Sequence, residues 1–352
     1  MTLRNRISLA TALLAAGALL AGTVPDREPA PVAAGDERLT AAQAWPSASR
    51  ADLPDLGIEP LLFLDATTAV GTVSDRDALR LVIVADGRQR ELRRLPAGGD
   101  ARFDTVTASG EDLLWTESTG DRPTEIWTAR AHADESPRMI TADTGNVLFY
   151  GTQYDLVVAD GRVHWTAGEG SGSTQIRSVA LTGGAVQVRT EAGQWALTAW
   201  PWLTDDAAGG QTGAITMRNL ETGSRVAVPV AASEWSMCSP SWCRVMVMDS
   251  SGPVRIDAMR PDGSDRRRVA GPQAQAAVTD VAVLDRFEIL SEPGPNADLT
   301  GVAGLIVHDL DTGRTVALSA AADLAATRDG MLWWSTGDQE TAIWHTLDLR
   351  TA

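Results

Sequence analysis

A tryptophan-rich segment followed by acidic residues is the part of this sequence best suited to binding chemistry. Trp195, Trp200 and Trp202 lie within eight residues, and Asp205 and Asp206 follow them. Indole rings stack on the apolar faces of sugar rings, and nearby carboxylates accept hydrogen bonds from hydroxyl groups. The segment therefore predicts a binding surface of this kind, formed by Trp200, Trp202, Asp205 and Asp206.

Residues with catalytic or metal-binding potential occur without the spacing that such chemistry needs. Four histidines are present, none at ligand spacing from another: His132, His164, His308 and His345. Neither a metal centre nor a cofactor is therefore expected. The glycine-rich run 168–173 lacks the Gly-x-Ser-x-Gly spacing of a hydrolase nucleophile. Carboxylates are plentiful, so a glycosidase-type pair of acids stays an alternative, although nothing in the sequence selects its members.

The two cysteines, Cys238 and Cys243, flank the turn signal of Pro240. Cysteines on either side of a hairpin turn can lie within disulfide range. A zinc site would want about four ligands, and no histidine is near. We therefore predict a structural disulfide, which implies an oxidising compartment.

The N-terminal segment has the layout of an export signal. Arg4 and Arg6 precede an uncharged run from Ile7 to Val24, and charged residues follow Pro25. This layout predicts a signal peptide or an uncleaved membrane anchor over residues 1–24. Residues 25–38 are rich in proline, alanine and charge, and they are expected to form a disordered tether.

The charge of the chain restricts its partners. The formal net charge is −16, and lysine is absent from the sequence. A chain this acidic is repelled by nucleic-acid phosphates and by anionic lipid head groups. Nucleic acid is therefore excluded as a partner, and the arginine triplet 266–268 is expected to be a solvated hairpin face.

One pattern recurs along the chain beyond residue 38. The segments 219–228 and 309–318 match in residue type at almost every position, and each turns at a Thr-Gly step. A second element, a glycine followed by a tryptophan strand, recurs at Trp115, Trp165 and Trp334. Glycine tolerates the positive φ of a tight turn, so each unit is expected to contain four antiparallel strands. A period of about 40 to 50 residues is typical of a propeller blade.

The repeat predicts an all-β chain that forms a single β-propeller over residues 39–352. Seven units are expected, with six or eight as alternatives: 60–99, 100–143, 144–190, 191–231, 232–273, 274–319 and 320–352. The last unit ends after its third strand. We expect the segment from Leu39 to Trp45 to supply the missing outer strand and close the ring, because closure removes an exposed edge.

The tryptophan strands, the Asp/Glu-Thr-Gly hairpins and the export signal together resemble the TolB-type propellers of bacterial envelopes. The resemblance covers roughly residues 40–352, and it implies a propeller architecture and an interaction role outside the cytoplasm.

A structural alternative exists for the tryptophan cluster, because these side chains would equally wedge between blades, as the repeat tryptophans are expected to do. Tyr150 and Tyr154 are a lesser candidate for binding. The sequence as a whole favours a noncatalytic, monomeric, extracytoplasmic propeller that binds an envelope protein or cell-wall component on one end of the ring. The alternatives are a secreted hydrolase or lyase with carboxylates at the channel, and a membrane-anchored sensor ectodomain. Clustered channel acids with a raised pKa would favour the enzyme, and an apolar patch would favour binding.

Overall fold

The computed structural model describes residues 38–54, 56–98, 100–120, 122–170, 172–205, 215–294, 297–337 and 341–352, without the side chains of 298 and 299. The predicted signal or anchor and, apart from Arg38, the predicted tether lie outside the described residues. Leu39–Ala352 forms one compact unit. Within the described ranges, no helix is long and apolar enough to cross a membrane.

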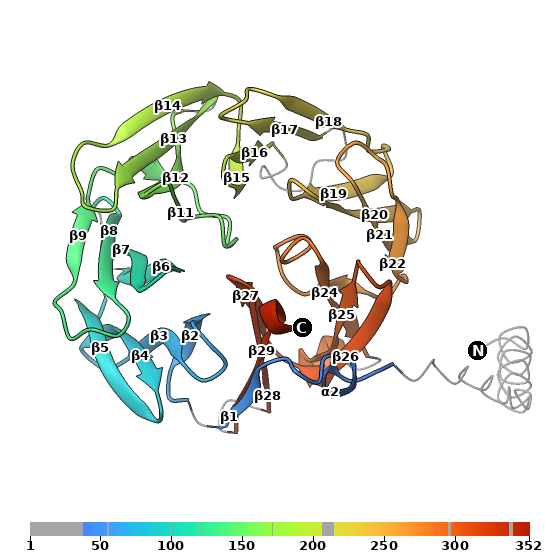
Figure 1. Cartoon of the computed structure of the whole chain (residues 1–352), viewed down its shortest axis with the longest axis horizontal. Coiled ribbons are helices and arrows are strands. Elements are labelled where there is room, and N and C mark those ends of the chain that lie inside the picture. Colours follow the sequence, from blue (N-terminus) through green and yellow to red (C-terminus); the bar gives the residue numbers. More distant parts are fainter. Residues whose placement is uncertain are drawn as a thin grey trace, which may run out of the picture. The chain divides into compact units, whose positions relative to one another are not determined.

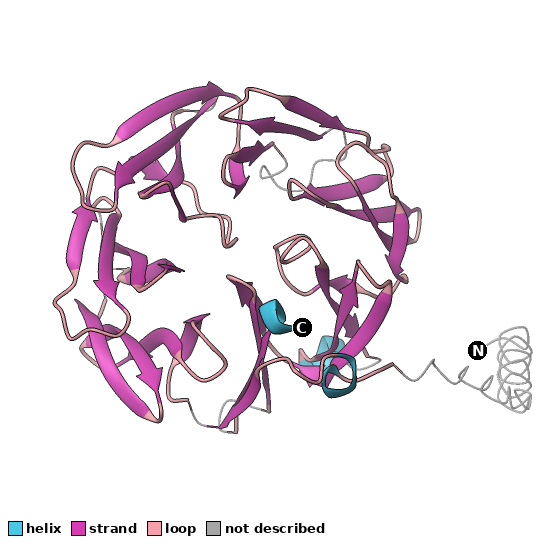
Figure 2. Ribbon diagram, in the orientation of Figure 1, coloured by secondary structure: helices cyan, strands magenta, loops and turns pink. Residues whose placement is uncertain are grey.

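Seven antiparallel sheets stand around a common axis, and each contributes one blade to a closed ring (Figure 1). Strands dominate, and short helices appear at three places in the described chain (Figure 2): α2 (Ala41–Ala44), α3 (Ala297–Thr300) and η2 (Leu349–Thr351). The predicted all-β propeller with seven four-stranded blades is therefore confirmed.

Blades 1 to 6 run from the axis outward in chain order, and blade 7 does so for its three inner strands, with β1 outermost. Blade 1 contains β2 (Glu59–Phe63), β3 (Ala69–Ser74), β4 (Ala78–Ala85) and β5 (Arg88–Pro96). Blade 2 contains β6 (Arg102–Ser109), β7 (Asp112–Ser118), β8 (Glu125–Arg130) and β9 (Arg138–Thr141). Blade 3 contains β10 (Asn146–Val147), β11 (Val157–Ala159), β12 (Arg162–Gly168), β13 (Ser173–Ala180) and β14 (Gln187–Ala192). Blade 4 contains β15 (Ala196–Ala199), β16 (Trp202–Thr204), β17 (Ile215–Asn219) and β18 (Arg225–Val228). Blade 5 contains β19 (Glu234–Cys238), β20 (Cys243–Asp249), β21 (Gly252–Met259) and β22 (Arg267–Ala270). Blade 6 contains β23 (Gln275–Ala276), β24 (Phe287–Pro293), β25 (Ala303–Asp309) and β26 (Arg314–Ala322). Blade 7 contains β27 (Ala325–Arg328), β28 (Met331–Thr336), β29 (Ile343–Asp348) and β1 (Arg50–Pro54).

The hairpins have the turn chemistry that the repeat predicts. At the Asp86–Gly87 turn between β4 and β5, φ is 51° and 69°. Two consecutive residues with positive φ match the right-handed twist of the flanking strands, and Asp-Gly is a preferred pair for such a turn. The same dipeptide conformation recurs at Asp160–Gly161 and Asp329–Gly330.

The ring is closed by an N-terminal strand, as predicted, but by a different segment. The closing strand is β1, which pairs with β29 from Arg50 opposite Leu347 to Pro54 opposite Ile343. The predicted strand Leu39–Trp45 is wrong, because this segment forms the single turn α2. Its run of alanines favours a helix, and Thr40 and Gln43 form a capping box at its start.

The blades pack through large side chains that lie between neighbouring sheets. Trp115 and Trp165 are fully buried, and Trp334 is nearly so. The repeat tryptophans therefore wedge between blades as expected. Trp45, just after α2, lies edge-on to Phe287 of blade 6 with ring centroids 5.6 Å apart, so the N-terminal segment is held by core packing as well as by strand pairing.

Candidate functional site

A cavity of about 450 Å3 lies near the ring axis among the innermost strands of blades 4, 5 and 6 and an inward loop of blade 3. Most of its wall is apolar or aromatic, and this wall includes Tyr150, Tyr154, Leu197, Trp235, Met237 and Val281. Concave, mainly apolar sites with a few polar groups are the usual form of a ligand pocket. We call this cavity the axial pocket.

The strand β19 brings the most exposed apolar side chains to the axial pocket. Its burial alternates, so that Glu234, Ser236 and Cys238 are buried while Trp235 and Met237 are 45% and 39% exposed. Period-2 alternation places these two side chains on one face of the strand. Exposure of large apolar side chains on this inner strand is unfavourable unless something covers them.

Both ends of β19 are fixed. At its C-terminal end, Cys238 and Cys243 lie opposite each other in the pairing of β19 with β20, with a Cα–Cα distance of 4.0 Å, and they form a disulfide. The predicted disulfide is therefore present. The carbonyl oxygen of Cys238 also accepts a hydrogen bond of 2.7 Å from Thr198 Oγ1, which joins β19 to β15 of blade 4.

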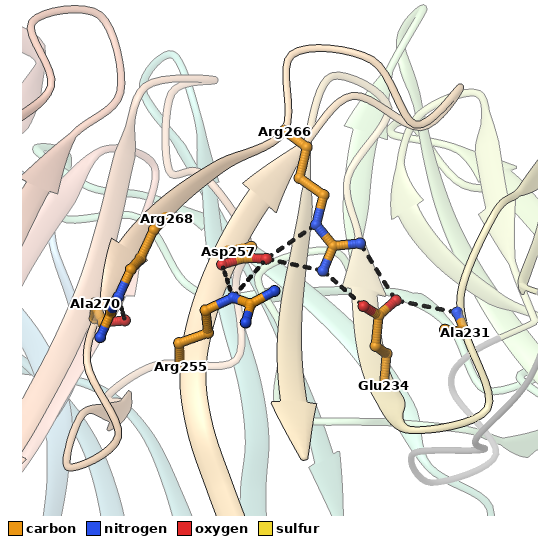
Figure 3. A network of polar contacts seen from close by, with 7 residues as sticks. All are labelled: Ala231, Glu234, Arg255, Asp257, Arg266, Arg268 and Ala270. Carbon is orange, nitrogen blue, oxygen red and sulfur yellow. Dashed lines mark hydrogen bonds and ion pairs between the residues drawn. The ribbon is translucent and has the colours of Figure 1, made fainter. Parts of the chain in front are cut away.

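At its N-terminal end, β19 is held by a polar network that spans blade 5 (Figure 3). The guanidinium of Arg266 lies 2.7 Å from a carboxylate oxygen of Glu234 and 2.8 Å from one of Asp257. Arg255 contacts the other oxygen of Asp257 at 2.9 Å. The hydrogen bond from Arg266 is the main reason why the pKa of Glu234 lies below its usual value. Arg266 and Arg268 are exposed, as expected of a solvated hairpin face, and Arg266 in addition pairs with two buried carboxylates.

Replacing Arg266 with alanine is expected to destabilise the protein at neutral pH by roughly 2 kcal/mol, since the buried Glu234 loses its cation and Asp257 keeps its contact with Arg255 alone. Because folding lowers the pKa of Glu234, its stabilising contribution is present above its ordinary pKa of 4.5 and is lost as the pH falls through the lowered value. Urea unfolding of the wild type and of Arg266→Ala at pH 7 and pH 3.5 measures this loss of stability. The difference between them should shrink at the lower pH. Arg268, which donates to Ala270 O in the same region, is the control (Figure 3); an equal loss in Arg268→Ala would contradict the assignment.

Blade 3 sends a loop into the centre of the ring. Its innermost strand is interrupted, because β10 and β11 both pair with β12 and the segment from Leu148 to Leu156 leaves the sheet between them. This segment, the axial loop, points toward the middle of the ring in Figure 1. Asp155 stabilises it by accepting backbone hydrogen bonds from Tyr150, Gly151 and Thr152 at 2.9, 2.7 and 3.2 Å.

The axial loop crosses to the opposite blades. Thr279 of blade 6 donates to the carbonyl of Gly151 at 3.0 Å, and the backbone N–H of Asp329 in blade 7 donates to Gln153 Oε1 at 3.2 Å. Further hollows of about 430 and 310 Å3 share Tyr154 and Asp280, respectively, with the axial pocket. The loop therefore divides the space around the axis.

Acidic groups gather where the loop meets blades 6 and 7. Burial raises the pKa of Asp155, Asp280 and Asp329 above the usual range, and the nearby Arg328 opposes that rise in each case. Burial also lowers the pKa of Arg328. The pKa of Tyr154 is strongly raised, first by burial and then by the negative charges of Asp280, Asp285 and Asp329. Three carboxyl groups thus lie close to one guanidinium.

A buried ion pair shapes the blade 6 wall of the axial pocket. Arg244 and Glu288 are 4% and 1% exposed and lie 2.6 Å apart. Arg244 also donates to the carbonyls of Val278 and Asp280, at 3.1 and 2.7 Å, and Glu288 accepts from Ala282 N at 2.7 Å. All these hydrogen bonds are made to residues 278–282, in the segment that precedes β24.

That segment is strained. Ala282, Leu284 and Asp285 have φ of 49°, 58° and 59°, a conformation that costs a non-glycine residue of order 1 kcal/mol or more. Strain of this kind persists only where the surroundings over-determine the backbone, as Arg244 and Glu288 do here.

The sequence-predicted binding residues do not come together at the axial pocket. The rings of Trp200 and His164 are in tilted contact, with centroids 3.7 Å apart, and Trp200 packs against the core between blades 3 and 4. Trp202 packs against the core cluster shared by blades 4 and 5. Asp205 accepts a hydrogen bond of 2.7 Å from Thr216 N, and Asp206 lies outside the described residues. The sugar-binding role of these four residues stays a prediction.

The structure also locates the other residues considered for binding or chemistry. Tyr150 and Tyr154 do line the axial pocket. Burial lowers the pKa of His164 to about 4, so it is neutral at pH 7. Among the described residues, no group of three or more histidine, cysteine, aspartate or glutamate side chains is placed to hold a metal ion. Trp235 and Met237 were missed by the sequence analysis, although the alternation of segment 234–238 contains the signal.

Comparison with known proteins supports the fold alone. No protein-family model and no curated protein sequence matches the chain. An uncharacterized protein from Listeria monocytogenes is 8% identical with a TM-score of 0.53, over 80% of this chain and 89% of that one. A puromycin-hydrolyzing peptidase from Mycobacterium tuberculosis is 15% identical with a TM-score of 0.53, over 91% of this chain and 53% of that one. The chain thus spans about half the length of that peptidase.

TolB from Acinetobacter baumannii also matches, at 10% identity and a TM-score of 0.39, over 79% of each chain. The propeller architecture that the TolB-type resemblance implies is present in the ring described above. Identities this low carry no information on activity or partners.

Proposed function

We propose that this chain is a noncatalytic binding propeller, and that its axial pocket accepts an apolar group of an envelope protein or cell-wall component. The observation that carries the proposal is the exposure of Trp235 and Met237 on β19, facing a cavity of about 450 Å3. Covering apolar surface yields about 25 cal/mol per Å2, and tryptophan and methionine offer much of it.

The rigidity of the wall supports recognition. A disulfide, the Arg266 network and the buried Arg244–Glu288 pair all hold backbone segments that line the pocket. A pocket that is already formed loses little conformational entropy when it binds its ligand. Such preorganisation is what a binding platform needs.

The raised pKa values of Asp155, Asp280 and Asp329 favour a second candidate, a hydrolase with channel carboxylates. Two of these carboxylates, however, take part in contacts that hold the axial loop and blade 7 in place. Asp155 accepts three backbone N–H groups of its own loop, and Asp280 accepts from Thr327 Oγ1 at 3.1 Å. Binding is therefore the preferred function.

An extracytoplasmic location belongs to the same proposal. The Cys238–Cys243 disulfide supports it, because such bonds persist in oxidising compartments. The anchored-sensor alternative depends on residues 1–24, and the mass of the mature protein tests it: cleavage of a signal would remove about 2 to 3 kDa.

A peptide library displayed on phage tests the binding function. Clones selected on the wild-type protein are expected to lose about tenfold or more in affinity for Trp235→Ala and Met237→Ala, the loss typical of an apolar anchor at an interface. Met139 is the matched control for Met237, because it is 45% exposed on β9, in the outermost position of blade 2. Affinities measured by biolayer interferometry decide the outcome.

Equal binding by wild type and both pocket variants would overturn the axial pocket as the site. Loss of binding in Trp202→Ala alone, with a normal melting temperature, would instead support the surface predicted from the tryptophan-rich segment.

A further inference from the structure

We infer that the group bound in the axial pocket carries a positive charge on an apolar stem, and is thus an alkyl- or arylammonium group. This inference rests on the proposed function and adds the chemical class of the ligand. Four features of the pocket support it: its acidic groups, its aromatic wall, the acceptor capacity of Asp280, and phenol groups without a protein partner.

Acidic groups lie in the pocket lining and in the hollow beside it: Asp280 lines the axial pocket, and Asp285 and Asp329 line the hollow that shares Tyr154. The charges of all three act on Tyr154. The arginine in the lining, Arg244, is already paired with Glu288. Arg328 interacts with Asp155, Asp280 and Asp329, and Arg350 interacts with Asp329 as well. A cationic ligand would be attracted by these acidic groups.

The aromatic wall favours the same ligand. Tyr150, Tyr154 and Trp235 line one cavity together with Asp280. The faces of aromatic rings attract cations, and an adjacent carboxylate adds to that attraction where water is partly excluded. Leu197, Met237 and Val281 on the same wall would pack against the apolar stem of the ligand.

Asp280 retains the capacity to bind a cation. Its carboxylate accepts from Thr327 Oγ1 at 3.1 Å and from Gln153 N at 3.4 Å, whereas a carboxylate has about four acceptor sites. A positive charge nearby would also offset the burial that raises the pKa of Asp280. Binding of an ammonium group should therefore strengthen as the pH rises and Asp280 ionises.

The two phenol groups are available as hydrogen-bond partners. Within the described part of the chain, neither the Tyr150 nor the Tyr154 hydroxyl has a hydrogen bond to another residue. The burial that raises both pKa values keeps these groups protonated at neutral pH. A phenol oxygen accepts hydrogen bonds, so each can take one from an ammonium N–H.

A pair of probes with the same shape and different charge tests the inference. We would titrate the protein with 4-phenylbutylamine and with 4-phenylbutanol at pH 7 and low salt, by isothermal calorimetry. The amine is expected to bind about tenfold more tightly than the alcohol, the size expected for a partly desolvated cation beside aromatic rings and a carboxylate. In Asp280→Asn this preference should fall to about twofold or less while alcohol binding is unchanged.

Two variants control the experiment. Asp262→Asn removes a carboxylate from the exposed turn between β21 and β22 and should keep the full preference. Asp329→Asn lowers the same central charge from blade 7, so it keeps the test valid if Asp280→Asn does not fold. Both are compared with wild type by thermal melting before titration.

The outcomes separate the two proposals. Equal affinity for amine and alcohol would overturn the inference and leave the apolar pocket standing. Binding of neither probe at millimolar concentration would count against the pocket itself. The source of the ammonium group follows from the selected peptides: if replacing their lysine with norleucine removes binding, the ligand is a protein side chain, and if only the free amine binds, it is a small molecule.

Discussion

Replacing Arg244 with alanine is expected to lower the free energy of unfolding by roughly 3–5 kcal/mol, the usual cost of breaking a buried ion pair by removing one partner. The variant leaves Glu288, which is 1% exposed, without its cation. It also removes the donors to the carbonyls of Val278 and Asp280. Urea unfolding followed by tryptophan fluorescence measures the loss.

A double variant separates the loss of a partner from the loss of packing. Arg244→Met combined with Glu288→Leu removes both charges and keeps most of the volume, so it should be within roughly 1–2 kcal/mol of wild type. If the double variant were as unstable as Arg244→Ala, or if Arg244→Ala cost less than 1 kcal/mol, the ion pair would not have the role described here.

Removing the closing segment is expected to have an even larger effect. A chain shortened to residues 56–352 lacks Trp45, whose loss alone should cost about 3–5 kcal/mol because a buried indole is replaced by a void. It also lacks β1, so the edge of β29 is left open. Compared with a chain of residues 38–352, the shorter chain should show no cooperative thermal transition by circular dichroism.

Adding the missing segment back as a peptide tests whether its absence is the cause of the lost stability. A synthetic peptide of residues 38–54 supplied to the shortened chain should restore the transition, and the same peptide with Leu53→Pro should restore less of it, since Leu53 pairs with Trp344 in the ladder. A shortened chain that melts like the longer one would show that strand closure does not stabilise the ring.

Much of the fold follows from local signals in the sequence. The turn conformation at Asp-Gly steps such as Asp86–Gly87 is determined by those two residues alone. The tryptophan strands repeat with the period of a blade. The closing strand was misplaced because capping by Thr40 and Gln43 and a run of alanines gave a helical turn where a strand was expected. Helix capping is also a local signal.

The candidate site was less accessible from the sequence. Trp200 and Trp235 are both tryptophans in β-rich segments, yet one packs against His164 and the other is exposed at the axial pocket. The difference depends on which face of a strand meets the neighbouring blade, and this is set by contacts distant in the chain. The gathering of Asp280 and Asp329 around the axial loop is likewise non-local. The sequence indicated Tyr150 and Tyr154 only as a lesser candidate for binding.

The pairing of β1 with β29 also has a consequence for the order in which the chain can fold. Arg50 is synthesised well before Leu347, yet they are neighbours in the finished sheet. Folding rates fall as contacts join more distant residues, because the entropy of closing the loop is lost before the contact forms. Six blades can therefore assemble during synthesis while β1 waits without a partner. Until β29 is made, a nascent chain has an open strand edge that is prone to aggregation, and an export machinery or chaperone would have to protect it for that time.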